Sequence, residues 1–250
     1  MKKIIIISII LGVLGVTACS SQGKKSGPDL KKASMINVQL GSAYLRQDKV
    51  ALAKTKLEKA LQQDADNALA HSTMALLLEV VGQHENIIDH YEEAISLDPA
   101  DSDIKNNFGT YLCNQKRYEE AQKYFNIAIN DPYYKTPSVA LINAGQCALK
   151  TGKYKKAEAF LRKALRTNPK SLSALYAMAS LGLRSQRYLM SRAYIQRYHL
   201  NSKPSAKSLW LQIKVEKSLG DRKEMRKLIE QMNKKFPDSD EAGLAMGLIR

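Results

Sequence analysis

Apolar residues of two sizes recur along this chain with a period of about 34 residues. The pattern divides the chain into six units, which start at Ser34, Ala68, Ser102, Ser138, Leu172 and Ala206. Position 8 of the unit holds Gly41, Ala75, Gly109, Gly145, Ala179 and, as the exception to small residues, Ile213. Position 24 is always large and apolar: Leu57, Tyr91, Phe125, Leu161, Ile195 and Ile229. Apolar residues at this spacing predict two helices in each unit.

The small residues indicate how the two helices pack. Small side chains at positions 8 and 20 let antiparallel helices approach closely, while the large residue at position 24 fills the space beside them. Glycine or a polar residue near position 15 favours a tight turn, and proline at position 32 stops the second helix in three units. The unit matches the tetratricopeptide repeat. The sequence therefore predicts an all-α fold, a right-handed superhelical solenoid of six helix hairpins.

The repeat register sets the predicted domain boundaries. The six repeats are expected at residues 34–67, 68–101, 102–137, 138–171, 172–205 and 206–239. The third repeat is two residues longer than the others. Repeats five and six depart most from the small-residue pattern. Met225 stands at position 20, and Tyr198 and Met232 stand at position 27, where small residues let neighbouring helices pack closely. Residues 240–250 are expected to form a helix that caps the last exposed apolar face.

The N-terminus is typical of a targeting segment. Lys2 and Lys3 precede an apolar run at residues 4–16, which is shorter than the ~20 residues of a membrane-spanning helix. The following Val-Thr-Ala-Cys resembles the lipobox of bacterial lipoproteins. This resemblance implies a signal peptide at residues 1–18, fatty acylation (palmitate or a similar chain) of Cys19 and a flexible tether at 19–33. Because Ser20 rather than Asp follows the cysteine, we expect a lipid anchor in the outer membrane, facing the periplasm. An ordinary signal peptide is the alternative.

Composition and charge narrow the classes of function. With 44% hydrophobic and 25% charged residues, the chain is neither a disordered tail nor a polytopic membrane protein. Its net charge of +15 favours anionic partners. Basic clusters at residues 153–166 and 222–235 lack an organised aromatic stacking surface, so no nucleic-acid partner is predicted. No two of the four histidines are four residues apart, as a metal-binding pair on one helix face would be. The sequence also contains no recognisable glycine-rich phosphate-binding loop and no Ser-His-Asp or Cys-His arrangement. We therefore predict no catalytic residue, cofactor, metal or small-molecule substrate.

Repeats three and four carry the most specific motifs of the chain. They are Asn106-Asn107-Phe108-Gly109, the linker Asp131-Pro132-Tyr133-Tyr134-Lys135-Thr136-Pro137, and Asn143-Ala144-Gly145 followed by Cys147. Together with the lipobox and six repeats, these motifs resemble the PilF/PilW lipoproteins of type IV pilus biogenesis. The resemblance implies a pilotin that binds the secretin (PilQ) and helps it reach or assemble in the outer membrane. The alternative is a repeat lipoprotein that regulates cell-envelope or peptidoglycan assembly.

Two cysteines remain once Cys19 is assigned to acylation. Cys113 and Cys147 occupy positions 12 and 10 in the first helices of adjacent repeats, which pack side by side. An exported protein meets an oxidising compartment, and a bridge needs Cα atoms within about 7 Å. We predict a disulfide between them. The alternative is two buried small residues.

Polar side chains on the first helices of repeats three to five are candidate partner contacts. Asn106, Asn107 and Asn143 are expected near the concave face, where amides can bind a partner's extended backbone. The alternative is that these amides bond the inter-repeat turns and only hold the superhelix together. Gln146 and Arg184 are expected to add polar and charged contacts on the same face.

The first repeat is a second candidate surface. No repeat precedes it, so Val38 and Leu45 of its first helix are predicted to lack cover. Such an apolar groove would accept an amphipathic helix from a partner. The alternative is that residues 25–33 fold over it as a cap.

Overall fold

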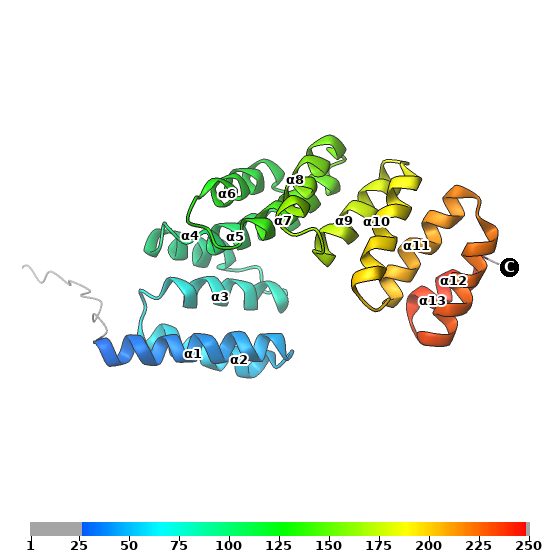
Figure 1. Ribbon diagram of the computed structural model, residues 1–250. Coiled ribbons are helices and arrows are strands. Elements are labelled where there is room, and N and C mark those ends of the chain that lie inside the picture. Colours follow the sequence, from blue (N-terminus) through cyan, green and yellow to red (C-terminus); the bar gives the residue numbers. More distant parts are fainter. Residues whose placement is uncertain (1–26, 249–250) are drawn as a thin grey trace, which may run out of the picture.

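The computed structural model describes residues 27–248, which form thirteen helices and no strand. Twelve of them pair into hairpins (Figure 1). The hairpins are α1 (Pro28–Arg46) with α2 (Val50–Gln63), α3 (Ala68–Val80) with α4 (Ile87–Leu97), α5 (Ser102–Asn114) with α6 (Tyr118–Asn130), α7 (Pro137–Lys150) with α8 (Tyr154–Thr167), α9 (Leu172–Arg184) with α10 (Tyr188–Asn201), and α11 (Ala206–Leu219) with α12 (Arg222–Lys235). The last helix, α13 (Asp240–Met246), packs on α11 and α12.

The first helices of successive hairpins touch one another, from α1 and α3 through to α9 and α11. Within residues 27–248 no second helix contacts another second helix. The array therefore curves with the first helices on its inner side (Figure 1). The predicted all-α tetratricopeptide solenoid is confirmed. None of the helices described is both long and apolar enough to cross a membrane.

The small and large positions of the repeat form the core of each hairpin. All six side chains at position 24 are at most 1% exposed. A Cβ atom on Gly41 would lie 2.8 Å from Leu57, and one on Gly145 would lie 2.8 Å from Leu161. Both contacts are closer than van der Waals separation, so glycine at position 8 lets the large residue at position 24 fill the hairpin.

Position 15 forms the turn between the two helices of every hairpin. Gly82, Gly152 and Gly220 adopt φ values of 69–75° there. The same left-handed conformation occurs without glycine at Asp48, Lys116 and Gln186, with φ values of 58–62°. Because the left-handed region penalises a Cβ atom, tertiary packing must hold these three turns in place.

The first helix begins earlier than the sequence pattern predicts. Residues 28–33 were expected to end the tether at residues 19–33, but α1 already starts at Pro28. The physical reason is local, because proline at the first helical position has its φ angle pre-set and Asp29 complements the helix dipole. The other repeats begin within one residue of their predicted starts. The predicted signal peptide and Cys19 lie outside the described residues.

Helices α9 and α10 pack closely at Gly182, which faces the backbone of Ser191. A Cβ atom on Gly182 would lie 2.7 Å from the Ser191 nitrogen and 2.8 Å from its Cα. We expect Gly182→Ala to push α9 and α10 apart and to lower the free energy of unfolding by about 1–3 kcal/mol. Urea denaturation followed by circular dichroism measures this loss. Gly243→Ala is the control, because no atom lies within 4 Å of its added Cβ.

Candidate partner-binding surfaces

The first repeat exposes an apolar surface, since no hairpin precedes it within residues 27–248. In α3, Ala70 and Met74 occupy repeat positions 3 and 7 and are 0% and 6% exposed, packed against the first hairpin. The same two positions of α1 hold Ile36 and Leu40, which are 49% and 38% exposed. We call Ile36 and Leu40 the end face. It is the surface on which another hairpin would pack if the array continued.

The prediction that Val38 and Leu45 lack cover in this repeat is wrong. Val38 is only 1% exposed and belongs to a cluster with Leu57 of α2 and Met74 of α3. Leu45 is half-buried against the same cluster. At 100° per residue, Val38 and Leu45 point toward the following hairpin, while Ile36 and Leu40 point away from it. The uncovered groove therefore does not include Val38 or Leu45.

The inner face of the array is a second exposed surface. It is formed by positions 2, 6, 9 and 13 of the first helices, of which position 6 is buried in repeats two, five and six. In repeat two it is apolar, with Leu69 51% and Val80 62% exposed. In repeats three and four the equivalent rows carry amides, including Asn107, which is half-buried, and Gln146, which is exposed. Arg184 is exposed at position 13 of repeat five.

Asn106 and Asn143 bond each other across two repeats. Asn143 Nδ2 donates to Asn106 Oδ1 at 3.0 Å, joining α7 to α5. Asn106 is only 3% exposed, so its side chain is not free to meet a partner. This geometry differs from the partner contact predicted for Asn106 and fits a structural role, holding adjacent repeats together. Asn107 and Asn143 both occupy position 6 of the inner face and are half-buried, whereas Asn106 lies at position 5.

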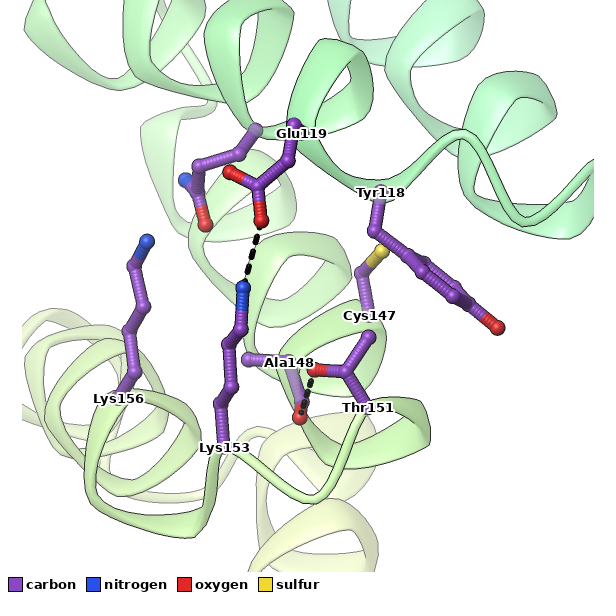
Figure 2. A pocket seen from close by; sticks show the side chains of 8 residues that line it. Tyr118, Glu119, Cys147, Ala148, Thr151, Lys153 and Lys156 are labelled. Carbon is purple, nitrogen blue, oxygen red and sulfur yellow. Dashed lines mark hydrogen bonds and ion pairs between the residues drawn. The ribbon is translucent and has the colours of Figure 1, made fainter.

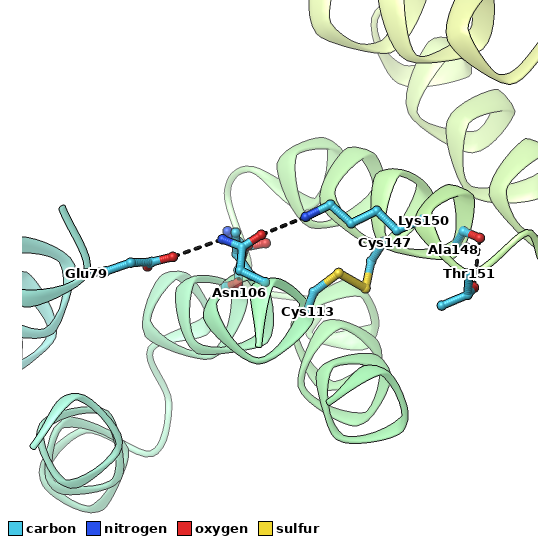
Figure 3. The surroundings of a disulfide bond; sticks show 9 residues. Glu79, Asn106, Cys113, Cys147, Ala148, Lys150 and Thr151 are labelled. Carbon is cyan, nitrogen blue, oxygen red and sulfur yellow. Dashed lines mark hydrogen bonds between the residues drawn. A yellow bond between two sulfur atoms is a disulfide. The ribbon is translucent and has the colours of Figure 1, made fainter. Parts of the chain in front are cut away.

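The predicted bridge between Cys113 and Cys147 is present in the structure. The S–S distance is 2.06 Å and the Cα atoms are 5.9 Å apart. A polar chain crosses the same helices beside it (Figure 3). Asn114 donates to Glu79 at 2.9 Å and accepts from Lys150 Nζ at 2.7 Å. Repeats two, three and four are thus joined by hydrogen bonds, and repeats three and four also covalently.

A shallow hollow lies on the other side of the same junction (Figure 2). Lys153 Nζ forms an ion pair with Glu119 Oε1 at 2.6 Å across it, linking α6 to the start of α8. The hydrogen bond from Lys153 lowers the pKa of the Glu119 carboxyl below its usual value. The other lining residues are Tyr118, Gln122, Cys147, Ala148, Thr151 and Lys156. This pair adds a fourth connection between repeats three and four, after the Asn106–Asn143 bond, the disulfide and the Asn114–Lys150 bond.

Two histidines meet within repeat two. His71 Nδ1 lies 2.9 Å from His90 Nδ1, and His71 Nε2 lies 2.9 Å from the carbonyl oxygen of Ala65. The carbonyl oxygen can only accept, so Nε2–H of His71 donates a hydrogen bond to it. With the proton on Nε2, His71 Nδ1 accepts and His90 Nδ1 is the donor between the rings. Burial, and the nearby His71, lower the pKa of His90. Over residues 27–248 no three histidine, cysteine or acidic side chains converge as a metal site would require.

Comparisons with known proteins agree with this architecture. Residues 90–123 and 138–171 each match the tetratricopeptide repeat family. An uncharacterised protein of Haemophilus influenzae is 40% identical over 132 residues, which is 53% of this chain and 73% of that protein. The type IV pilus assembly protein PilF of Pseudomonas aeruginosa is 29% identical over 235 residues, covering 92% of this chain and 93% of PilF.

The crystal structure of PilW, a widely conserved type IV pilus biogenesis factor, superposes with a TM-score of 0.80. That match has 29% identity and covers 85% of this chain and 98% of PilW. The chain is a tetratricopeptide repeat protein that is similar over most of its length to the type IV pilus biogenesis proteins PilF and PilW. Tetratricopeptide repeat proteins typically bind protein partners through the surfaces of such arrays.

Sequence reasoning missed Ile36 and Leu40 of the end face, although a signal for them was present. When the sequences of the first two repeats are aligned, Ile36 and Leu40 of α1 correspond to Ala70 and Met74 of α3. Positions 3 and 7 are therefore the ones that a preceding repeat covers. In a first repeat, large apolar residues at those two positions predict an open surface.

Proposed function

We propose that this chain is an outer-membrane lipoprotein of type IV pilus biogenesis that acts as a pilotin. In this proposal, acylation of Cys19 anchors the chain, and the repeats bind the secretin and promote its localisation or assembly. The lipobox at residues 16–19 supports the anchor. The likeness to a type IV pilus assembly protein over 92% of this chain supports the pathway. The protein acts by binding alone.

The end face carries the proposal for how the partner is bound. Ile36 and Leu40 lie 4 residues apart on α1 and are half-exposed, as in an unfinished helix–helix interface. An amphipathic helix of the secretin placed there would take the position of the missing hairpin. Burial of each side chain contributes on the order of 1 kcal/mol, since about half of a full burial of ~1.5–3 kcal/mol remains available.

The anchor and the end face lie close together in the sequence. Residues 19–27 connect the proposed lipid to α1, a segment that reaches at most about 30 Å when fully extended. The end face therefore stays near the membrane in which the secretin ring assembles. Holding the binding surface there raises its effective concentration for the partner.

The secretin contact is tested by polar substitutions on the end face. We expect Ile36→Ser combined with Leu40→Ser to lower the amount of secretin that co-purifies after mild crosslinking by about thirtyfold, since the two side chains together contribute ~2 kcal/mol and ~1.4 kcal/mol is a factor of ten. The matched control is Leu189→Ser with Leu200→Ser on α10, whose side chains are 69% and 84% exposed. Undiminished secretin capture by the end-face variant would contradict the proposed site. Capture of peptidoglycan-assembly proteins without secretin would favour the envelope-regulator alternative.

The anchor is tested separately. We expect Cys19→Ala to remove the protein from the outer-membrane fraction and to reduce piliation, while the repeats keep their thermal stability. The measurement is membrane fractionation with surface pilus counts. Normal pili and unchanged fractionation of this variant would rule out the anchoring role.

A further inference from the structure

The inner face of the last three repeats has an uneven distribution of charge. At positions 2, 6, 9 and 13 of α7, α9 and α11 there is no acidic residue. The same twelve positions hold four basic residues, namely Lys150, Arg184, Lys207 and Lys214. Lys150, Arg184 and Lys207 are exposed, and Lys214 is partly buried. This surface is therefore a cationic strip on the concave side of the array.

The cations of this strip are not neutralised by the protein. None of the ion pairs found within residues 27–248 includes any of the four. Lys150 donates only to the neutral amide of Asn114, and Lys214 Nζ lies 5.4 Å from the centre of the Trp210 ring. By contrast, Arg162 on α8 and Arg187, which directly precedes α10, both pair with Glu158. The strip retains its charge for a ligand.

The spacing of the cations fits an extended peptide. Lys150 and Arg184 occupy the same repeat position on α7 and α9, and Lys214 lies one turn before that position on α11. Adjacent packed helices are about 8–10 Å apart. A polyproline II segment rises about 3.1 Å per residue and brings every third side chain to the same face, about 9 Å along. Carboxylates three residues apart therefore match cations on consecutive helices.

The chain also offers contacts for the peptide backbone. Gln146 is exposed on the inner face one turn before Lys150, and its amide both donates and accepts hydrogen bonds. A polyproline II segment leaves its own carbonyl groups free for such bonds. We propose that the inner face of repeats four to six binds an acidic, extended segment of a partner protein with carboxylates at every third residue. The strip is separate from the end face and does not depend on secretin binding there.

A fluorescein-labelled peptide with four Glu-Pro-Pro repeats tests this proposal. The full-length protein, in detergent micelles, is titrated into the peptide and fluorescence anisotropy is recorded at 50 and 200 mM salt. We expect saturable binding that weakens as the salt concentration rises. Lys150→Glu with Arg184→Glu is expected to weaken binding at least tenfold. Lys163→Glu with Arg226→Glu makes the same change in net charge on exposed sites of α8 and α12, and is expected to alter binding less than twofold.

The outcomes separate the proposal from its alternatives. Equal weakening by both double variants would show a non-specific charge effect and would overturn it. A twelve-residue oligothymidine or phosphatidylglycerol vesicles competing as well as the peptide, through Lys150 and Arg184, would identify a general anion surface and would also overturn it. Thermal melts of both variants verify that the array is folded. Loss of secretin capture by the end-face variant is a different readout and leaves this test unaffected.

Discussion

Replacing Arg192 with leucine is expected to destabilise the junction of repeats five and six by about 3 kcal/mol. Glu216 on α11 is 0% exposed, and the Arg192 guanidinium on α10 donates to both of its carboxylate oxygens, with Nε 3.1 Å from Oε1. Arg192 also pairs with Asp221 at 3.1 Å. Removal of the arginine leaves a buried carboxylate without its cation, which costs far more than the net contribution of an intact pair. Hydrogen exchange on α11 and α12 measures the loss locally.

The reason for this loss is tested by a second variant. Arg192→Leu combined with Glu216→Leu removes the charge together with its partner, and is expected to recover most of the lost stability. Lys227→Leu is the matched control, because its ion pair with Glu224 is exposed and contributes little. If the double variant were as unstable as Arg192→Leu, burial of the charge would not be the cause.

Removing the disulfide is expected to have an effect of similar size in the middle of the array. Cys113 and Cys147 are 34 residues apart, and closing a loop of that length lowers the entropy of the unfolded chain by an amount equivalent to about 3–4 kcal/mol. We therefore expect Cys113→Ala with Cys147→Ala to lower the stability of repeats three and four by about this amount. Chemical denaturation monitored by hydrogen exchange of α5 to α7 provides the measurement.

Chemical reduction offers an independent comparison. Dithiothreitol treatment of the unmodified protein is expected to produce the same loss as the double alanine variant, and to add nothing to that variant. Unchanged protection of α5 to α7 after complete reduction, verified by thiol titration, would show that packing alone holds the two repeats together.

The repeat arrangement was predictable from the sequence because each repeat presents the same packing requirement. Gly41 and Gly145 are small because Leu57 and Leu161 occupy the space beside them. The same pairing of a position-8 residue with a position-24 residue recurs from repeat to repeat. The disulfide was predictable for the same reason, because a fixed register places Cys113 and Cys147 on neighbouring helices. Local patterns determine these features.

Other features depend on contacts that periodicity does not encode. Glu216 resembles a surface residue in the sequence, and only the position of α10 shows that Arg192 meets it. Asn106 had two predicted roles, and its hydrogen bond with Asn143 favours the structural one. The early start of α1 depends on Pro28, which lies before the repeat pattern begins. Single side chains between elements were therefore the least predictable part.

The bridge between repeats three and four also has a mechanical consequence. If the array is pulled from its two ends, unravelling can proceed inward one repeat at a time, since each repeat contacts only its neighbours. The residues between Cys113 and Cys147, which include all of α6, cannot add to the length of the stretched chain. The disulfide therefore withholds about 120 Å of fully extended chain from the stretched length. Unfolding from the two ends thus stops at the disulfide-linked repeats in the centre of the array, and the outer repeats can refold onto them when the load is released.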